Sequence, residues 1–153
     1  MLLYRLGKTR HAHKLDGAGA RDYPGRWNSL GTALVYASES SSTAVLEVRA
    51  HVRTLRHNLA MTILEVPDGV RTRTLRPADL PHGWNWMRYL DRVRAVGDAH
   101  VAQGGHLILR VPSAVDPHAW NCLLNPLHPE MVHVRVVKVE PYSMDPRLFR
   151  TKE

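Results

Sequence analysis

The chain has 153 residues, is 44% hydrophobic, and carries 21 Lys and Arg against 14 Asp and Glu. This length and apolar content predict one compact domain over residues 1–153, large enough to fold without disulfides or a metal. The single cysteine excludes an internal disulfide, and neither a signal-peptide core nor the ~20 apolar residues of a membrane span are found, so we expect a soluble, cytoplasmic protein.

The first half of the chain predicts two strands and one helix. Residues 2–6 are a short strand candidate, and residues 7–24, rich in Gly, Ala, His and Asp, are expected to be irregular. The apolar run 32–37 predicts a buried strand bounded by Gly31 and by serines. Those serines are N-cap candidates for a helix over about 43–56. Its apolar face consists of Ala44, Val45, Val48, Val52 and Leu55.

The rest of the chain predicts three strands and one long helix. In order, we expect a strand over 58–67, a loop over 70–85, a helix over 86–105, a strand over 106–112, turns over 121–130 and a strand over 131–140. In the last strand the valine alternation changes phase at Val137, which predicts a β-bulge. About five strands and two helices without regular alternation indicate a small α+β domain with a mixed or mostly antiparallel sheet.

Glu47 is an acid at the edge of the apolar arc of the predicted helix 43–56. It lies beside His51 on the helical wheel, and Arg49 and Arg53 stand at spacings that cannot neutralise it. Two interpretations remain open from periodicity. The glutamate lies in water at the rim, bonded to His51, or it faces a cleft, where it stabilises a developing cation or accepts a proton.

Arg26, Trp27 and Tyr36 have ordinary structural explanations when each is taken alone. The arginine can pair with a surface carboxylate, the tryptophan can pack, and the tyrosine can end a buried strand with its hydroxyl satisfied. Singly, none of the three identifies a site.

Two blocks of sequence, taken together, are more specific. The first is GRWN (25–28), Gly31, VYAS (35–38), Ala44 and Leu46-Glu47; the second is VGDAH (96–100), LRVPSAV (109–115) and NCLLNPLHP (121–129). In this order they resemble the RES domain family, the toxins of RES–Xre toxin–antitoxin pairs. The resemblance covers about residues 2–140, while the loop 68–85 carries no motif of it.

The resemblance implies a fold similar to ADP-ribosyltransferase toxins, with a split β core and flanking helices around an NAD-binding cleft. The implied activity is cleavage of NAD⁺ between nicotinamide and ribose, by hydrolysis or phosphorolysis, or else ADP-ribosylation of a protein. NAD⁺ is then a substrate rather than a cofactor, and phosphate is a possible co-substrate. The implied partner is an Xre-type antitoxin, with a toxin homodimer in a larger complex, no direct nucleic acid, no membrane and no metal.

The resemblance also assigns residues. Arg26, Tyr36 and Glu47 correspond to the active-site arginine, tyrosine and glutamate, and the named serine corresponds to Ser113; candidates of second rank are Asn28, Asn121 and Asn125. In this assignment Glu47 stabilises the positive charge that develops on ribose C1′ as nicotinamide departs. Arg26 grips the diphosphate, and Tyr36 offers its ring and hydroxyl to nicotinamide. No glycine-rich dinucleotide fingerprint is present, so a Rossmann mode is not expected.

Other classes remain as alternatives. The basic balance permits a nucleic-acid binder or ribonuclease toxin, although no helix-turn-helix or zinc-finger spacing is found. Ten histidines raise the possibility of a metal hydrolase, but their spacings match no standard ligand set. Ser113 lacks the G-x-S-x-G context of a serine hydrolase, and Cys122 is expected to be buried filler. A pure interaction module is the last alternative, with the charge serving a protein contact.

Overall fold

Seven strands form one mixed sheet in the computed structural model, which describes residues 1–54 and 56–149. Their order is β4-β5-β6-β2-β1-β3-β7, and all neighbours are antiparallel except β4 and β5, which are parallel. The strands are β1 (Leu2–Lys8), β2 (Val35–Ser38), β3 (Leu59–Glu65), β4 (Thr72–Thr74), β5 (Ile108–Pro112), β6 (Trp120–Leu124) and β7 (Arg135–Tyr142). The predicted α+β fold with a mixed sheet is therefore confirmed.

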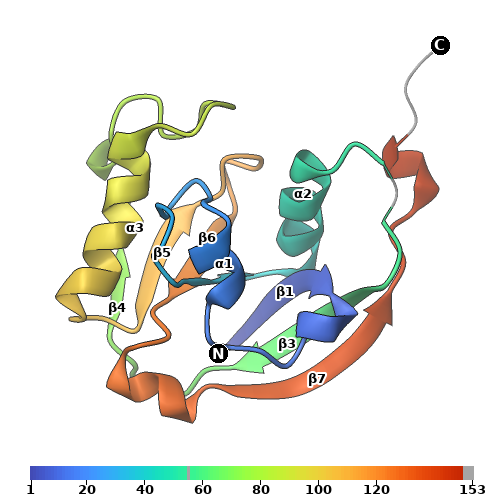
Figure 1. The fold of residues 1–153 in the computed structure, drawn as a ribbon, viewed down its shortest axis with the longest axis horizontal. Coiled ribbons are helices and arrows are strands. Elements are labelled where there is room, and N and C mark those ends of the chain that lie inside the picture. Colours follow the sequence, from blue (N-terminus) through green and yellow to red (C-terminus); the bar gives the residue numbers. More distant parts are fainter. Residues whose placement is uncertain (55, 150–153) are drawn as a thin grey trace.

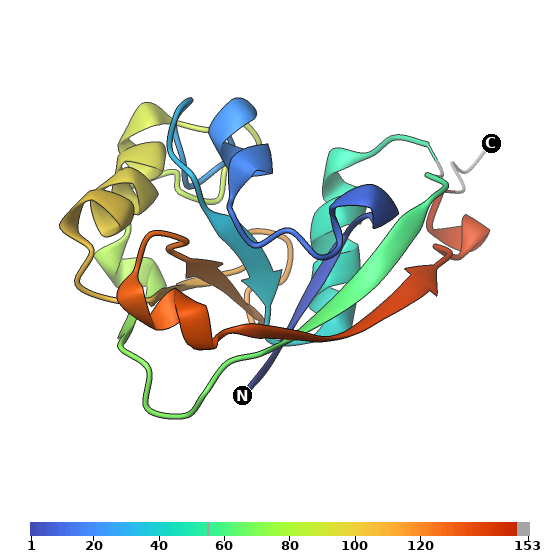
Figure 2. The same ribbon diagram turned by 60° about the horizontal axis from the view of Figure 1, so that its bottom comes forward.

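The sheet is split at the junction of β1 and β2. These strands share a single register pair, Tyr4 with Ser38, whereas β1 pairs with β3 along its whole length. One half contains β4, β5, β6 and β2, and the other contains β1, β3 and β7. The two halves lie side by side in Figures 1 and 2, with α3 against the first and α2 against the second.

The helices begin and end where local chemistry predicts. They are α1 (Ala18–Asp22), α2 (Ser41–His51) and α3 (Asp91–Gln103), with 3-10 turns at Thr9–His11, Pro77–Asp79, Pro129–His133 and Pro146–Phe149. The Ser40 side chain caps α2 by accepting from the Thr43 amide at 3.1 Å. Gly104, at a φ of 60°, closes α3 in the left-handed conformation that glycine adopts without strain.

The core consists of three groups of buried side chains. One spans the sheet and joins both halves, with Leu3 and Leu64 packed with Leu124. A second lies between α3 and the β5–β6 hairpin, around Val93 and Leu123. The third lies under α2, around Ala44 and Met61. The site described below therefore rests on a core that continues beneath both halves.

Several sequence-based bounds are corrected by the structure. Residues 7–24 contain the short α1, the loop 70–85 contains β4, and the predicted turns 121–130 begin with strand β6. The first long helix covers Ser41–His51 rather than 43–56, and the second begins at Asp91 rather than at 86. The prediction for Leu55 lies outside the described residues. The bulge is confirmed, because the β3–β7 register skips Val137 between Lys138 and Val136.

None of the helices formed by the described residues combines the length and the apolar character that crossing a bilayer requires.

A buried histidine in α3 makes stability dependent on pH. His100 is 6% exposed, and its Nε2 has no partner among the described residues. Burial lowers its pKa from 6.5 to about 4. As pH falls, the His100 side chain is therefore protonated in the unfolded chain at a higher pH than in the folded protein. We expect the free energy of unfolding to drop by up to about 3 kcal/mol between pH 6.5 and pH 4.

Urea unfolding across this pH range tests the expectation. A His100→Leu variant is expected to lose part of the pH dependence, because no proton is then taken up at this position on unfolding. The exposed His13→Gln variant serves as control and keeps the parent slope. Equal slopes in the parent and in His100→Leu would contradict the prediction.

Candidate active site

A pocket of about 280 Å³ opens between α2 and the loop that precedes β2. Arg26, Tyr36 and Glu47, far apart in the sequence, all line it. β1 and β2 form its floor, and Asn121 closes one side; the remaining lining residues include Tyr4, Arg5, Leu6, Ser38, Val48 and His51. The structure thus brings the three principal candidates into one hollow.

The helical period explains why Glu47 reaches this pocket. Ala44, Glu47, Val48 and His51 share one face of α2, because positions 44 and 51 each lie three and four residues from positions 47 and 48, and all four line the pocket. The edge of the apolar arc is therefore the pocket-facing edge. His51 does not bond the carboxylate; its Nδ1 lies 2.6 Å from the backbone carbonyl of Glu47. The cleft interpretation of Glu47 is the one that the geometry favours.

Two donors from the other half of the sheet hold the Glu47 carboxylate. Ser113 Oγ donates to Glu47 Oε1 at 2.8 Å, and Asn121 Nδ2 donates to the same oxygen at 2.5 Å. The described residues give the second oxygen, Oε2, no hydrogen-bond partner. One carboxylate oxygen is thus anchored and the other is left for a ligand.

The two donors are themselves oriented by neighbouring groups. Backbone amides of Val115 and Asp116 each donate to Ser113 Oγ at 3.2 Å, which directs the hydroxyl proton toward Glu47. Ser38 Oγ donates to Asn121 Oδ1 at 2.7 Å, which fixes the amide with its NH₂ group on the carboxylate. Ser113 and Asn121 are both buried. The carboxylate is therefore held by rigid groups rather than by mobile surface chains.

Tyr36 is held by the turn that carries Arg26. Its hydroxyl donates to Asn28 Oδ1 at 2.7 Å and accepts from the Trp27 amide at 3.2 Å. Burial raises the pKa of Tyr36 far above its ordinary value, so the phenol stays protonated. Asn28 is fully buried and uses its own NH₂ group on carbonyls of the same turn, that of Ala20 at 2.7 Å among them.

Arg26 is engaged by a segment that the sequence predicts to be a loop and the start of a helix. Its Nη1 donates to the carbonyls of Trp84 at 2.6 Å and Trp86 at 2.8 Å. Its guanidinium lies 4.7 Å from the centroid of the Tyr89 ring. Burial lowers the pKa of Arg26, while the nearby Tyr89 and Glu47 counteract this effect. The arginine therefore joins the pocket to segment 84–89.

Tyr89 was missed from the sequence. Its hydroxyl contacts His51 Nε2, so it links α2 to Arg26 across the pocket mouth. The available signal is the aromatic density of GWNWMRYL (83–90), a segment that the sequence analysis divides between a loop and the start of a helix.

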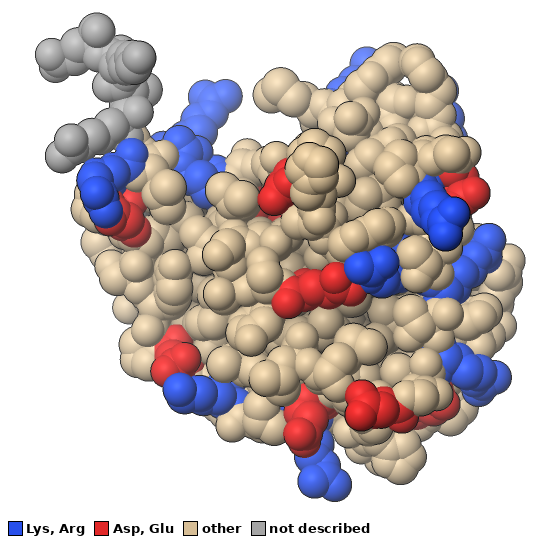
Figure 3. All heavy atoms as spheres, turned by 180° about the vertical axis from the view of Figure 1, so that it is seen from behind, with Lys and Arg blue, Asp and Glu red and all other residues tan. Residues whose placement is uncertain are grey.

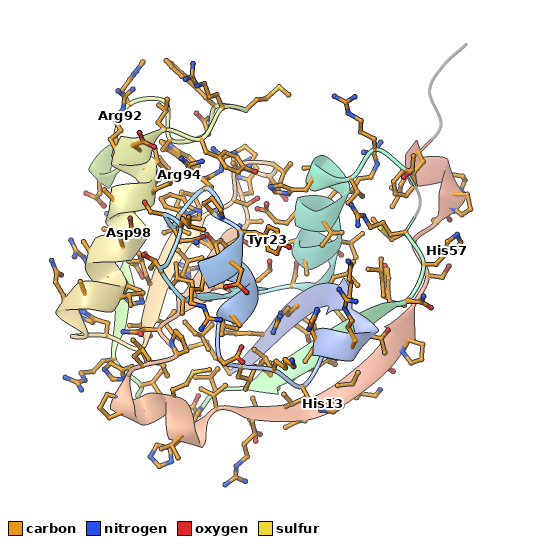
Figure 4. All side chains as sticks on the ribbon, viewed as in Figure 1. His13, Tyr23, His57, Arg92, Arg94 and Asp98 are labelled. Atoms are coloured by element: carbon orange, nitrogen blue, oxygen red, sulfur yellow. The ribbon has the colours of Figure 1, made fainter. Side chains whose placement is uncertain are left out.

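Helix α3 fixes the loop that carries Arg26. Asp98 Oδ1 accepts from the Ser29 amide at 2.9 Å, and Arg94 Nε donates to the Gly25 carbonyl at 3.2 Å. Both side chains project from α3 toward this loop (Figure 4). Burial alone would raise the pKa of Asp98, but hydrogen bonds from Ser29 and Thr32 hold it below its ordinary value.

The remaining sequence candidates fall outside the pocket. Asn28 and Asn125 do not line it. Asn125 Oδ1 accepts from the Leu127 amide at 3.0 Å. Asn125 thus has a structural role in the turn after β6. Ser113 touches the site through Glu47 alone. Of the three asparagines, only Asn121 lies at the carboxylate.

Two alternative chemistries gain no support from the described residues. No three His, Cys, Asp or Glu side chains within residues 1–54 and 56–149 gather into a possible metal site. Cys122 is buried, and burial raises its pKa to about 12, which makes it a poor nucleophile.

The comparisons with known proteins agree with one another. The RES domain model matches residues 2–145. A protein of Sphingobium sp. (strain YBL2) named Prs ADP-ribosylating toxin is 36% identical over 148 residues, 94% of this chain and 91% of the relative. A Toxin Res of Pseudomonas putida is 33% identical over 153 residues, 97% of this chain and 100% of the relative.

A solved structure has the same fold at low sequence identity. It is a chain in the crystal structure of the M. tuberculosis MbcT–MbcA toxin–antitoxin complex, with a TM-score of 0.76 at 18% identity. The match covers 97% of this chain and 86% of that one. The family model and the relatives confirm the resemblance found in the motifs: this chain belongs to the RES domain family.

Proposed function

We propose that the protein is the toxin of a toxin–antitoxin pair and that it cleaves NAD⁺ at the bond between nicotinamide and ribose. The observation that carries the proposal is the gathering of Arg26, Tyr36 and Glu47 around one pocket, with Glu47 anchored through a single oxygen. The relatives named toxins support the biological role.

In the proposed reaction the C1′–N1 bond breaks and its electron pair stays on nicotinamide, which leaves as a neutral molecule. Positive charge develops on the ribose at that moment. The Glu47 carboxylate, fixed by Ser113 and Asn121 before the substrate arrives, stabilises this charge through its free oxygen. A lone pair of the acceptor oxygen then forms the new bond to C1′, and when the acceptor is water its proton is released to solvent.

The other two residues have binding roles in this proposal. Tyr36 stays protonated, keeps its hydroxyl on the turn that carries Arg26, and presents its ring to the nicotinamide end. Arg26 brings a guanidinium to the pocket rim, where it meets the diphosphate. Because Arg26 also bonds the carbonyls of Trp84 and Trp86, substrate binding and the position of segment 84–89 are linked.

The acceptor is resolved by product analysis. Purified protein free of any inhibitor is incubated with NAD⁺, with and without phosphate, and the products are identified by mass spectrometry. Free nicotinamide with ADP-ribose identifies hydrolysis, and phosphorylated ADP-ribose identifies phosphorolysis. No loss of NAD⁺ under either condition would refute the proposed function.

Transfer to a protein is a second candidate, because a relative of 36% identity is named an ADP-ribosylating toxin. The same chemistry serves it, with a protein side chain in place of water. Labelled NAD⁺ in a cell extract decides between the two, since transfer leaves label on a protein band whereas hydrolysis leaves it in small molecules.

No specific observation among the described residues supports the alternative of a nucleic-acid binder or ribonuclease toxin. Figure 3 shows one face of the described residues, on which basic and acidic side chains are interspersed among neutral ones. Pairs such as Arg110 with Glu39 and Lys138 with Glu140 neutralise part of the charge. Salt-dependent binding to RNA or DNA without loss of NAD⁺ would favour that alternative.

The partner proposed for this toxin is an Xre-type antitoxin. A solved structure of the same fold comes from a toxin–antitoxin complex, which supports a protein partner for this chain. Co-expression with the neighbouring gene product tests this, because a cognate antitoxin would co-purify and abolish NAD⁺ loss. An active toxin in the presence of every neighbouring product would contradict it.

Removing the guanidinium at position 26 is expected to weaken substrate binding. Arg26→Ala should raise the KM for NAD⁺ roughly 10- to 100-fold, since a charge-assisted bond to phosphate is worth about 1.5–3 kcal/mol. Steady-state kinetics measure this, and Arg135→Ala on β7 is the matched control. A parent-like KM in Arg26→Ala would show that the arginine serves only segment 84–89.

A further inference from the structure

A second pocket, of about 550 Å³, adjoins the first. The two share Arg5, Gly25 and Tyr36, so they are separated by a common wall rather than by a stretch of core. The second pocket lies between the start of the chain, up to Lys14, and helix α1. A ligand that extends past these three residues would therefore occupy both pockets.

Positive charge gathers in this second pocket. Its lining includes Arg5, Lys8, Arg10 and Lys14, and two acids, Asp16 and Asp22. Desolvation, followed by these four cations, lowers the pKa of the neighbouring His11. Asp22 is paired with Arg21 at 3.1 Å, and Asp16 accepts from the Ala18 amide. The cations outnumber the acids that could neutralise them, which suits an anionic ligand.

An exposed aromatic ring lies at the same pocket. Tyr23 follows α1, is 79% exposed and lines the second pocket. It lies between α1 and α2 in the view of Figure 4. No ring stacking or hydroxyl bond links this side chain to the other described residues. A free aromatic face beside clustered cations is the usual surface for a nucleotide base and its phosphate.

The size of the first pocket leads to the same ligand. At about 280 Å³ it reaches only the lower limit of pockets for drug-sized molecules, ~300–1,000 Å³, and a dinucleotide is larger than such a molecule. If nicotinamide and its ribose lie beside Glu47, the adenylate half extends beyond this pocket, and the second pocket adjoins it at Arg5, Gly25 and Tyr36.

We propose that the second pocket is the adenylate half-site, in which adenine stacks on Tyr23 while Lys8, Arg10 and Lys14 hold the phosphate end. This inference rests on the proposed function for the identity of the substrate. The half-site would let the protein distinguish NAD⁺ from a mononucleotide, because a mononucleotide that lacks adenylate would not engage it.

Comparison of two substrates tests the half-site. NAD⁺ carries adenylate, whereas nicotinamide mononucleotide has the same scissile bond without it. Tyr23→Ala is expected to lower the ratio of kcat/KM for NAD⁺ to that for the mononucleotide roughly 10-fold, since base stacking is worth about 1–3 kcal/mol. Tyr23→Phe keeps the ring and should restore the ratio. The triple variant Lys8→Gln/Arg10→Gln/Lys14→Gln should lower it as well, more at low salt.

A matched charge control keeps the test specific. Arg73→Gln/Arg135→Gln/Lys138→Gln removes the same charge from β4 and β7 and should keep the parent ratio. Parent ratios in both Tyr23→Ala and the pocket triple variant would overturn the half-site.

Calorimetric binding of ADP-ribose gives a readout that does not depend on turnover. The parent should bind it about 10-fold more tightly than Tyr23→Ala does. If the parent consumed no NAD⁺ yet showed this difference, the proposed function would fail and the half-site would stand. If the pocket bound an acidic peptide but no ADP-ribose, the half-site would be wrong and a protein-docking surface would take its place.

Discussion

Glu47→Gln is expected to lower kcat for NAD⁺ cleavage roughly 10³-fold, the largest effect on activity in the molecule. The amide oxygen of glutamine can still accept from Ser113 and Asn121, so the side chain keeps its place. What it loses is the negative charge beside the ribose. Because the change acts on the transition state, KM should move far less than kcat.

The matched control for this variant is Glu65→Gln. Glu65 is an exposed acid at the end of β3 and does not line the pocket. Thermal unfolding of both variants shows whether the fold is intact. A Glu47→Gln protein that consumed NAD⁺ at the parent rate would remove the carboxylate from the mechanism.

Gly97→Ala is expected to lower the free energy of unfolding by about 3 kcal/mol or more. A Cβ atom at position 97 would lie 1.8 Å from the carbonyl oxygen of Trp27, which is backbone and cannot rotate away. In an ordinary helix interior the same change stabilises by up to ~1 kcal/mol, so the expected sign is reversed.

Calorimetry checks the prediction on Gly97. The melting temperature should fall by about 6–12 °C, or the variant should fail to fold. Gly105→Ala is the control, because nothing lies within 4 Å of its added Cβ. An unchanged or higher melting temperature in Gly97→Ala would contradict the close approach of α3 to the loop 25–28. That loop carries Arg26, so activity should fall together with stability.

The candidate site residues are predicted by the order of two separated motif blocks, because no one of these residues identifies a site by itself. GRWN lies in a tight turn, VYAS on a strand, and Glu47 on a capped helix whose periodicity places it at one edge. Ser113 and Asn121 stand at facing ends of β5 and β6 and were found through the motif alone. Periodicity does not reveal that two strand ends converge on one carboxylate.

The parts that were mistaken had weak or conflicting local signals. The sequence predicts turns in place of β6 because Asn125-Pro126 follows directly after the four buried residues 121–124 of that strand. β4 is a three-residue edge strand, all of it exposed, so no alternation marks it. The sequence predicts too early a start for the helix, because the mostly apolar residues 86–90 run directly into α3, but segment 84–89 contacts Arg26 and His51 instead of continuing α3. Tertiary contacts decide these elements.

Strand β7 forms one border of the sheet, and its outer side has no strand partner among the described residues. An exposed edge strand of this kind can pair with a strand of another chain, which leads to aggregation. The skipped register at Val137 bends the strand, Lys138 puts a charge there, and Pro141 lacks an amide proton to donate. The irregularity thus protects colloidal stability, and a straightened β7 would make this protein prone to aggregate at the concentrations that crystallisation needs.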